Sequence, residues 1–255
     1  MSALVMAPVA LAAVWLGGWW LSALVLLATV GMCWEWARLA TGGGFGATGA
    51  ATAATGVISV GALLWGVDLG AAVALAFAGS VAVLAIAAST RAAEPLWAAA
   101  GALWVVLGAA AFLWLALAHG RGTLLWLLAV VWATDIGAYI AGRSIGGPKL
   151  APRLSPNKTW AGLAGGVASA ALVGLIAARL SDAPAVALAL VSGALAVVAQ
   201  LGDLAESLAK RHFGVKDSSN LIPGHGGLLD RLDGLLAASV ATGLIALAFG
   251  NGPVQ

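Results

Sequence analysis

Residues 207–233 read SLAKRHFGVKDSSNLIPGHGGLLDRLD, and the rest of the chain is organised around this polar stretch. It gathers four basic and three acidic side chains in one short span: Lys210, Arg211, Lys216, Arg231, Asp217, Asp230 and Asp233. Glycines flank His225 on both sides, so the backbone there can approach a ligand closely or adopt a positive φ. Because charges are costly in an apolar protein, such a cluster predicts a functional site.

The composition around this stretch is that of a membrane protein. Hydrophobic residues make up 62% of the 255 positions and charged residues 9%, with a mean hydropathy of +1.03. Soluble domains carry about 25% charged residues, so an ordinary water-soluble fold is excluded. The length accommodates roughly nine apolar helices of about 20 residues with short connections. We therefore expect an all-α, polytopic integral membrane helix bundle, with residues 1–255 forming a single membrane domain.

The hydrophobic runs and the breaks between them predict where the spans lie. We expect them near residues 3–17, 18–38, 46–67, 69–89, 96–118, 123–143, 159–178, 184–206 and 233–250. Glycine and proline mark the breaks, for example at Gly120 and Pro184. The first run lacks the basic segment of a cleavable signal peptide, so we expect it to be retained. Residues 1–120 then supply the N-terminal spans, and residues 121–255 supply the spans and loops that carry the site.

Basic residues gather at alternate breaks between these spans. Ten of the twelve Lys and Arg residues follow the second, fourth, sixth and eighth spans, and only Arg121 and Arg179 fall on the other side. Cytoplasmic loops carry an excess of Lys and Arg. The pattern therefore predicts that the N-terminus and the polar stretch face the cytoplasm and that the C-terminus lies outside.

A first candidate site residue lies within a predicted span. At helical spacing, Asp135 shares a face with Tyr139 and Arg143. A carboxylate inside a span usually faces the bundle interior or an aqueous cavity. Two interpretations stay open: a carboxylate that serves a ligand site, and a structural ion pair with Arg143 or a neighbouring span.

A second candidate opens the seventh span. Residues 154–160 read LSPNKTW, in which Ser155 can cap the helix and Pro156 fits its first turn. A helix N-terminus that carries Lys158 and Thr159 suits a phosphate, because free N–H groups, the helix dipole and an ammonium all favour an anion. The alternative is that Ser155 is only a cap and Lys158 only an anchor beside the membrane.

The third candidate combines the ends of the last two spans. Asp203, Ser207 and Lys210 fall on one stripe of the eighth span. Asp230 and Asp233 lie three residues apart at the start of the ninth. Carboxylates from two helices offer hard oxygen ligands, which suit Mg²⁺ bound together with substrate phosphates. Interhelical salt bridges between these carboxylates and the nearby basic residues are the alternative.

These candidates together indicate a cytoplasmic site that is rich in basic groups and contains several carboxylates. Such a site suits a magnesium-assisted reaction on a polyphosphate. The chain has no Gly-x4-Gly-Lys-Ser/Thr loop and no set of His and Cys ligands, so neither a P-loop enzyme nor a zinc site is expected. Three roles stay open for His225, namely phosphate binding, proton transfer and a backbone hydrogen bond.

The polar stretch resembles the signature of the phosphatidate cytidylyltransferases, also called CDP-diacylglycerol synthases. The shared pattern is Ser207-x2-Lys210-Arg211-x4-Lys216-Asp217-x-Ser219-x2-Ile222-Pro223-x-His225-Gly226-Gly227-x2-Asp230-Arg231-x-Asp233. Two further segments are similar to that family in the same order, Asp135-x2-Ala138-Tyr139-x2-Gly142 and Ser155-Pro156-x-Lys158-Thr159. Residues 1–120 match only as apolar spans. Ala209 and Ala161 depart from the family pattern without touching a charged group.

The resemblance implies that CTP and phosphatidate react to give CDP-diacylglycerol and pyrophosphate with Mg²⁺, and it allows a second cation. It implies metal ligation by Asp203 and Asp230. The implied catalytic residues are Lys210, Arg211, Lys216, Asp217, His225, Arg231 and Asp233. The implied substrate-binding residues are Asp135, Ser155, Lys158, Thr159, Ser207, Gly226 and Gly227. A homodimer in the lipid bilayer, in a bacterial inner membrane and without a nucleic-acid partner, is also implied.

Other functions fit the sequence less well. A secondary transporter of an anionic metabolite, with Asp135 as a proton relay, would favour internal repeats, and the chain shows none of fixed period. A CDP-alcohol phosphotransferase would carry Asp-Gly-x2-Ala-Arg-x8-Gly-x3-Asp-x3-Asp, which does not occur here. A cytidylyltransferase that acts on a different lipid phosphate stays an open alternative.

Overall fold

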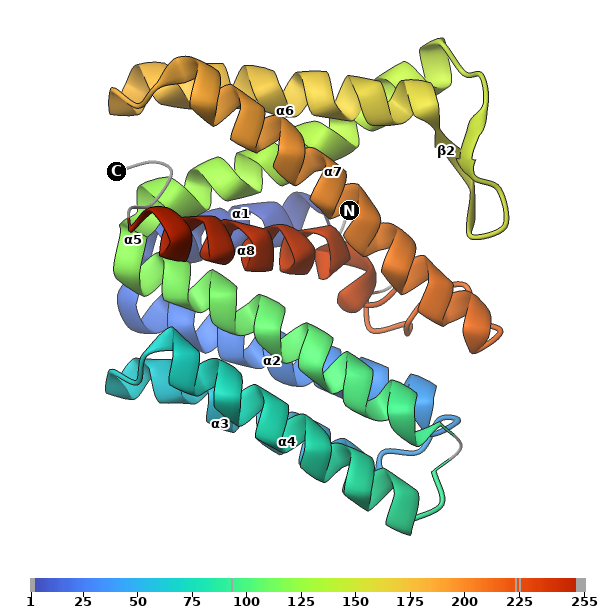
Figure 1. The fold of residues 1–255 in the computed structure, drawn as a ribbon. Helices are drawn as coiled ribbons and strands as arrows, with labels where there is room; N and C mark the ends of the chain where they lie inside the picture. The colour runs from blue at the N-terminus through green and yellow to red at the C-terminus, as the bar shows by residue number, and fades with distance from the viewer. Residues whose placement is uncertain (1–2, 93, 223, 225, 251–255) are drawn as a thin grey trace. The chain divides into compact units, whose positions relative to one another are not determined.

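A computed structural model describes residues 3–92, 94–222, 224 and 226–250, and most of them are helical (Figure 1). In chain order the elements are α1 (Ala3–Leu16), α2 (Gly18–Ala40), α3 (Gly46–Ala62), the 3₁₀ turn η1 (Leu63–Trp65), α4 (Leu69–Ser89), α5 (Pro95–Ser144), β1 (Lys149–Ala151), β2 (Ser155–Thr159), α6 (Trp160–Ser181), α7 (Ala185–His212) and α8 (Leu229–Phe249).

The apolar helices confirm an all-α polytopic membrane protein. Seven of them, within the described part of the chain, are long and apolar enough to cross a membrane: α2, α3 with η1, α4, α5, α6, α7 and α8. A shorter apolar helix covers Ala7–Leu16 within α1. The count of nine spans and the cytoplasmic N-terminus stay predictions.

The longest helix, α5, contains a break at the place where the sequence predicts one. It runs for 50 residues, but Gly120 inside it has φ 74° and ψ −178°, which is not helical. At 1.5 Å per residue an unbroken helix of that length would extend about 75 Å, against about 30 Å for a hydrocarbon core. Glycine accepts the positive φ without a steric penalty. Gly120 thus separates two helical segments that correspond to the predicted spans 96–118 and 123–143.

The prediction that Ser155 caps the seventh span is wrong. Ser155 lies in β2, which pairs antiparallel with β1, and α6 begins only after β2 ends. Pro156 disfavours helical backbone in the residue before it, and strand pairing satisfies the backbone there instead. Thr159 is the N-cap, because its Oγ1 accepts a hydrogen bond of 3.0 Å from Gly162 N. Lys158 therefore precedes the helix and does not occupy its first turn.

The helices and loops form two compact units. The first unit comprises Met1–Trp114 and His212–Leu232, and the second comprises Leu115–Arg211 and Asp233–Gln255. The polar stretch is divided between them. Its middle part belongs with the N-terminal helices, and its two ends belong with the second unit.

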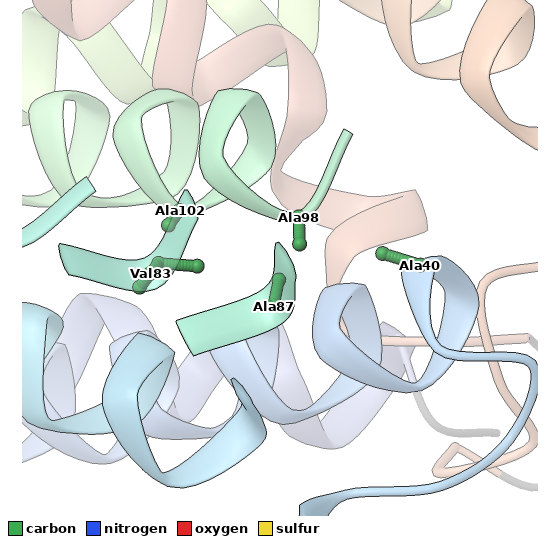
Figure 2. Packing of buried hydrophobic residues seen from close by; sticks show 5 residues of the cluster. All are labelled: Ala40, Val83, Ala87, Ala98 and Ala102. Atoms are coloured by element: carbon green, nitrogen blue, oxygen red, sulfur yellow. The ribbon is translucent and has the colours of Figure 1, made fainter. Parts of the chain in front are cut away.

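Small residues allow the helices of the first unit to pack closely. A buried cluster joins α2, α4 and α5 through side chains no larger than valine: Ala40, Val83, Ala87, Ala98 and Ala102 (Figure 2). In the same unit, a Cβ on Gly101 would lie 1.6 Å from the Trp36 ring, so only glycine fits there. Lipid-embedded helices associate through this kind of close packing, since lipid gives them no hydrophobic reason to associate.

Glycines serve the same purpose in the second unit, where α6 packs against the second half of α5 and against α7. A Cβ on Gly166 would lie 3.0 Å from the carbonyl oxygen of Thr134. One on Gly174 would lie 2.5 Å from Ser192 Oγ. The close packing holds β2 and the start of α6 beside the polar residues of α7.

Candidate functional site

The loop between α7 and α8, residues 213–228, carries the centre of the polar stretch, and we call it the signature loop. Its tip closes through a hydrogen bond of 2.9 Å from Ile222 N to Gly226 O. Gly224 and Gly226 have φ of 76° and 80°, which confirms that glycines there adopt a positive φ. Residues that have a Cβ rarely adopt this backbone conformation. His225, a predicted catalytic residue, lies outside the described residues.

Aromatic side chains fix the beginning of the signature loop. The His212 ring stacks on Trp97 with centroids 4.7 Å apart, and Phe213 packs edge-on against Trp36 at 6.4 Å. Trp36 Nε1 donates a hydrogen bond of 2.7 Å to Trp97 O, and His212 Nε2 lies 3.4 Å from Glu94 Oε1. The chain therefore enters the loop from a point attached to α2 and the start of α5.

Asp230, a predicted metal ligand, binds two separate parts of the signature loop. Its Oδ2 accepts hydrogen bonds from Ser218 N at 2.9 Å, Ser218 Oγ at 3.0 Å and Gly227 N at 2.7 Å. Hydrogen bonds to a charged group contribute about 1.5–3 kcal/mol each. This carboxylate therefore has a structural role in the loop, whichever ligand it also serves.

Glu35, on α2, is a site residue that the sequence analysis missed. It is fully buried, with an exposed fraction of 0%. It accepts hydrogen bonds from Ser219 Oγ at 2.6 Å, Leu228 N at 2.7 Å, Leu229 N at 2.7 Å and Ser218 Oγ at 3.4 Å. Burial of an unpartnered carboxylate is strongly unfavourable, and these four donors compensate for it.

The Glu35 contacts cap a helix from outside its own chain segment. α8 begins at Leu229, so the N–H groups of Leu228 and Leu229 have no partner within that helix. A negative charge at a helix N-terminus is also favoured by the helix dipole. Gly31 lies one helical turn before Glu35 and leaves room for Leu228. A Cβ added to Gly31 would lie 3.2 Å from Leu228 Cδ2.

Gly227 is required by this arrangement for a steric reason. A Cβ at this position would lie 1.9 Å from Ser218 Oγ and 2.6 Å from Glu35 Oε1. The backbone of Gly227 thus lies directly against the hydrogen-bonded groups. The neighbouring Gly226 is similarly close to Asp230, with Oδ2 2.8 Å from a hypothetical Cβ.

The remaining predicted residues of this region lie on its surface. Lys216, Asp217 and Arg231 are exposed, and Asp217 lies beside Gly226. Exposed basic groups such as Lys216 on the loop and Arg231 on α8 are of the kind that bind anionic phosphates. The structure does not test the catalytic roles predicted for them.

In the second unit, Lys158 bridges β2 and α7. Its Nζ lies 2.8 Å from Asp203 Oδ2 and donates a hydrogen bond of 2.8 Å to Gln200 Oε1. Ser207 Oγ donates a longer one, 3.4 Å, to Asp203 Oδ1. The structure thus brings together three residues that the sequence predicts for the site, and it adds Gln200 to them.

Further carboxylates lie around this group. Asp233 is partly buried and interacts electrostatically with Asp203, Lys210 and Asp135. Lys210 also forms an ion pair with Glu206, one turn earlier on α7, whose side chain is buried. This part of α7 therefore carries charges of both signs, and Glu206 and Lys210 pair because residues four apart on a helix are neighbours.

Two other predicted residues of the second unit lie at the surface. Asp135 is exposed, as is Tyr139, with 66% of its surface accessible on the same stripe of α5. Arg211, at the end of α7, is exposed as well. The two interpretations of Asp135 both stay open.

The charges suit a hard cation, although the described residues hold no preformed cage. No three His, Cys, Asp or Glu side chains in the described part of the chain are grouped as metal ligands. The proposed pair, Asp203 and Asp230, lies in different units and is not tested as a pair. Mg²⁺ commonly takes only one or two protein carboxylates and completes its shell with water and substrate phosphates. The electrostatic grouping of Asp203 with Asp233 and Asp135 fits such an ion.

Three functional candidates were missed for different reasons. Glu35 could have been found as an acidic residue inside an apolar span, which is a functional hypothesis by default. Glu206 and Gln200 lie on the same helix as Asp203 and Lys210, but no motif in the sequence distinguishes them from other polar residues of a helix. Only the fold shows that Gln200 meets Lys158.

Comparison with known proteins places the chain in a family. The sequence profile of the cytidylyltransferase family matches residues 1–249. The phosphatidate cytidylyltransferase of Brucella suis biovar 1 is 55% identical over 134 residues, which cover 51% of this chain and 48% of the relative. Those of Haemophilus influenzae and Bacillus subtilis are 47% and 46% identical over 126 and 120 residues, covering 47% and 46% of this chain and 44% and 45% of the relatives. Each match spans about half the length of the curated relative. The chain belongs to the cytidylyltransferase family, which confirms the resemblance of the polar stretch.

Proposed function

We propose that this protein transfers the cytidylyl group of CTP to phosphatidate, giving CDP-diacylglycerol and pyrophosphate in phospholipid biosynthesis. The observation that carries the proposal is the family match over residues 1–249, in a chain that keeps the polar stretch complete. The relatives that share 46–55% identity with it are named phosphatidate cytidylyltransferases. An integral membrane protein with a polar stretch that carries four Lys and Arg residues also suits one lipid and one water-soluble substrate.

The reaction needs little covalent chemistry from the protein. A phosphate oxygen of phosphatidate attacks the α-phosphorus of CTP, and a new phosphorus–oxygen bond forms there. The bond between the α-phosphorus and the oxygen bridging it to the β-phosphorus breaks, and its electron pair leaves with pyrophosphate. Since the nucleophile is already an anion, catalysis consists of alignment and of neutralising the negative charge that spreads in the transition state.

Basic side chains supply that neutralisation in this proposal. Lys158 is held by Asp203 and Gln200, and an ammonium with such partners can exchange them for a phosphate oxygen. The other basic groups assigned to the triphosphate and the lipid phosphate are Lys210, Arg211, Lys216 and Arg231. Asp135, Asp217, His225 and Asp233 shape or support the site.

Carboxylates hold the divalent cation in this proposal. Mg²⁺ bound to the substrate phosphates would reduce their negative charge and so favour attack by the lipid phosphate. Asp203 and Asp230 are the ligands that we assign to it, and a second cation is compatible with the charge of the site. The surrounding donors keep Asp230 in place, because three of them bind its Oδ2.

The proposal includes a topology. Nine spans with a cytoplasmic N-terminus, in a homodimer of the bacterial inner membrane, would expose the signature loop and the β1–β2 hairpin to cytosolic CTP. Single cysteines at Arg153 in the hairpin and Asp182 in the α6–α7 connection test this in inverted and right-side-out vesicles. We expect an impermeant maleimide to label Arg153→Cys only from the cytoplasmic side and Asp182→Cys only from the outer side. Labelling in the reverse sense would exclude this orientation.

Release of pyrophosphate from the purified protein tests the reaction. In detergent with Mg²⁺, we expect release only when CTP and phosphatidate are both present, together with a CDP-lipid product detected by mass spectrometry. Activity with another lipid phosphate but not with phosphatidate would keep the reaction and change the substrate. Absence of nucleotide cleavage with every lipid phosphate, combined with anion uptake by proteoliposomes, would instead support a transporter.

A further inference from the structure

We propose that Glu35 is a positioning residue for the reaction: it sets the conformation of the signature loop from the opposite end of the chain. The inference rests on the proposed function and adds to it a residue outside the polar stretch. Glu35 lies on α2, 183–194 residues before the groups that it binds. The described hydrogen bonds of its side chain all lie outside α2, because their four partners belong to the loop or to the start of α8.

The contacts of Glu35 define a single loop conformation. Its four partners are two serine hydroxyls and two backbone N–H groups, and the N–H groups can only donate. Two of the donors are backbone groups, whose positions depend directly on the path of the chain. Glu35 therefore determines where the loop ends and where α8 begins.

Ser218 connects Glu35 to the proposed chemistry. Its hydroxyl lies 3.0 Å from Asp230 Oδ2 and 3.4 Å from Glu35 Oε2, and its backbone N–H donates to Asp230 as well. Gly227 N also binds Asp230, while the space beside the Gly227 Cα is filled by Glu35 and Ser218. The orientation of Asp230 is thus determined by a loop that Glu35 holds. The exposed Lys216 and Asp217 directly precede Ser218 and Ser219, which contact Glu35. Their position therefore depends on the segment that Glu35 holds.

This role differs from ordinary stabilisation in what it predicts. A residue that only stabilises the fold changes the amount of active protein, but the molecules that fold keep the wild-type turnover. A residue that orients the loop changes turnover in protein that is fully folded, because misplacement of groups that act in the transition state lowers kcat. The matching observable outside catalysis is the mobility of the loop.

Glu35→Gln is the informative variant, because it keeps the size of the side chain and replaces one acceptor oxygen by an amide donor. We expect kcat to fall about tenfold or more while the KM values for CTP and phosphatidate stay within about threefold of wild type. Glu35→Asp keeps the charge but shortens the side chain, and we expect a smaller fall in kcat. Thr29→Val is the matched control: Thr29 is also fully buried in α2, but its hydroxyl binds only Val25 O of the same helix. We expect wild-type kcat from it.

The second measurement does not depend on activity. A nitroxide on Asn220→Cys, at an exposed position of the loop, reports its mobility by electron paramagnetic resonance. The native Cys33 is fully buried, and the parent protein without the new cysteine corrects for any labelling of it. We expect a distinctly more mobile spectrum in Glu35→Gln than in wild type or Thr29→Val, well below the unfolding temperature of each.

The outcomes separate the inference from the proposed function. A mobile loop in Glu35→Gln, in a protein whose wild type shows no cytidylyl transfer, would support the control of the loop by Glu35 and remove the proposed function. An active wild type whose Glu35→Gln variant keeps its kcat, or loses it with an unchanged spectrum, would overturn the inference. If Glu35→Gln does not yield folded protein, Ser219→Ala removes the shortest of the four hydrogen bonds from the loop side. Unchanged kcat and an unchanged spectrum in that variant would equally overturn the inference.

Discussion

The signature loop of the first unit and the Lys158 group of the second unit use polar contacts in opposite ways. Around Glu35, two of the four donors are backbone N–H groups, and the contacts fix the path of the chain. Around Lys158, both partners are side chains, Asp203 and Gln200. A lysine ammonium on its flexible stem can change partners without a change in the backbone, whereas the N–H groups of Leu228 and Leu229 cannot.

The contacts of the signature loop fix its conformation, whereas those of the Lys158 group hold a charge. The loop is held by a buried carboxylate whose partners are neutral donors, so its conformation is determined before any ligand binds. The Lys158 group is an ion pair with a partly exposed acid, since the Asp203 side chain is 35% accessible, and its charge can be transferred to a phosphate. Variants that disrupt the signature loop should therefore change turnover or stability. Variants that disrupt the Lys158 group should change the affinity for the nucleotide.

The largest effect is expected from Asp230→Asn. The amide oxygen can still accept the two backbone hydrogen bonds from Ser218 N and Gly227 N, so the loop keeps its shape, but the site loses a negative charge that Mg²⁺ requires. We expect activity to fall by about 100-fold or more in monodisperse protein, with only partial recovery in excess Mg²⁺. Initial rates of pyrophosphate release over a range of Mg²⁺ concentrations measure this.

Asp182→Asn provides the control for that change. The same change from Asp to Asn is made in the α6–α7 connection, away from the site. Asp182 has φ 52°, a conformation that asparagine tolerates. We expect the wild-type rate from it. Asp203→Asn should lose as much activity as Asp230→Asn, and the double variant little more, because both would disable one unit. A well-folded Asp230→Asn that keeps more than about a tenth of the wild-type rate, under ~1.4 kcal/mol of barrier, would exclude the assigned metal role.

A smaller and more selective effect is expected from Lys158→Ala. Loss of one charge-assisted contact, worth about 1.5–3 kcal/mol, should lower kcat/KM for CTP roughly 10- to 100-fold. The dependence on phosphatidate should change much less. Lys149→Ala, on the neighbouring strand β1 and exposed, is the matched control. Equal losses for both substrates would instead indicate that Lys158 mainly supports the structure around Asp203.

The sequence predicts these two regions unequally. Apolar runs determine the helices, and the break at Gly120 follows from a glycine between two runs. The stripe of Asp203 and Ser207 follows from helical spacing, which is a local property. An acid inside an apolar span marks Glu35 as a candidate, but the sequence does not indicate its partners, because they lie at residues 218–229 and only the packing of α2 brings them together. The β1–β2 hairpin, with strands of 3 and 5 residues, is too short for periodicity to indicate it.

Gly227→Ala tests whether close packing fixes the conformation of the signature loop, and the readout is stability. The added methyl group would overlap Ser218 Oγ and approach Glu35, and overpacking of this kind costs about 1–3 kcal/mol. We expect a lower unfolding midpoint in detergent, measured by intrinsic tryptophan fluorescence. Gly61→Ala, in α3 with no atom within 4 Å of the new methyl group, should keep or slightly raise the midpoint. An unchanged midpoint in Gly227→Ala would mean that the loop relaxes without resistance.

The smallest effect is expected from Thr159→Ala, next to Lys158. The residue pattern predicts nucleotide binding for this hydroxyl, and the structure gives it a hydrogen bond from Gly162 N as the N-cap of α6. Loss of a threonine cap costs about 0.5–2 kcal/mol, so the unfolding midpoint should fall slightly. Thr159→Ser keeps the oxygen and should restore it. If capping is the main role, kcat/KM for CTP should fall far less than in Lys158→Ala, since the ammonium of Lys158 stays in place. A loss of CTP use as large as that of Lys158→Ala, with an unchanged midpoint, would show instead that the hydroxyl contacts the nucleotide and that its cap contributes little.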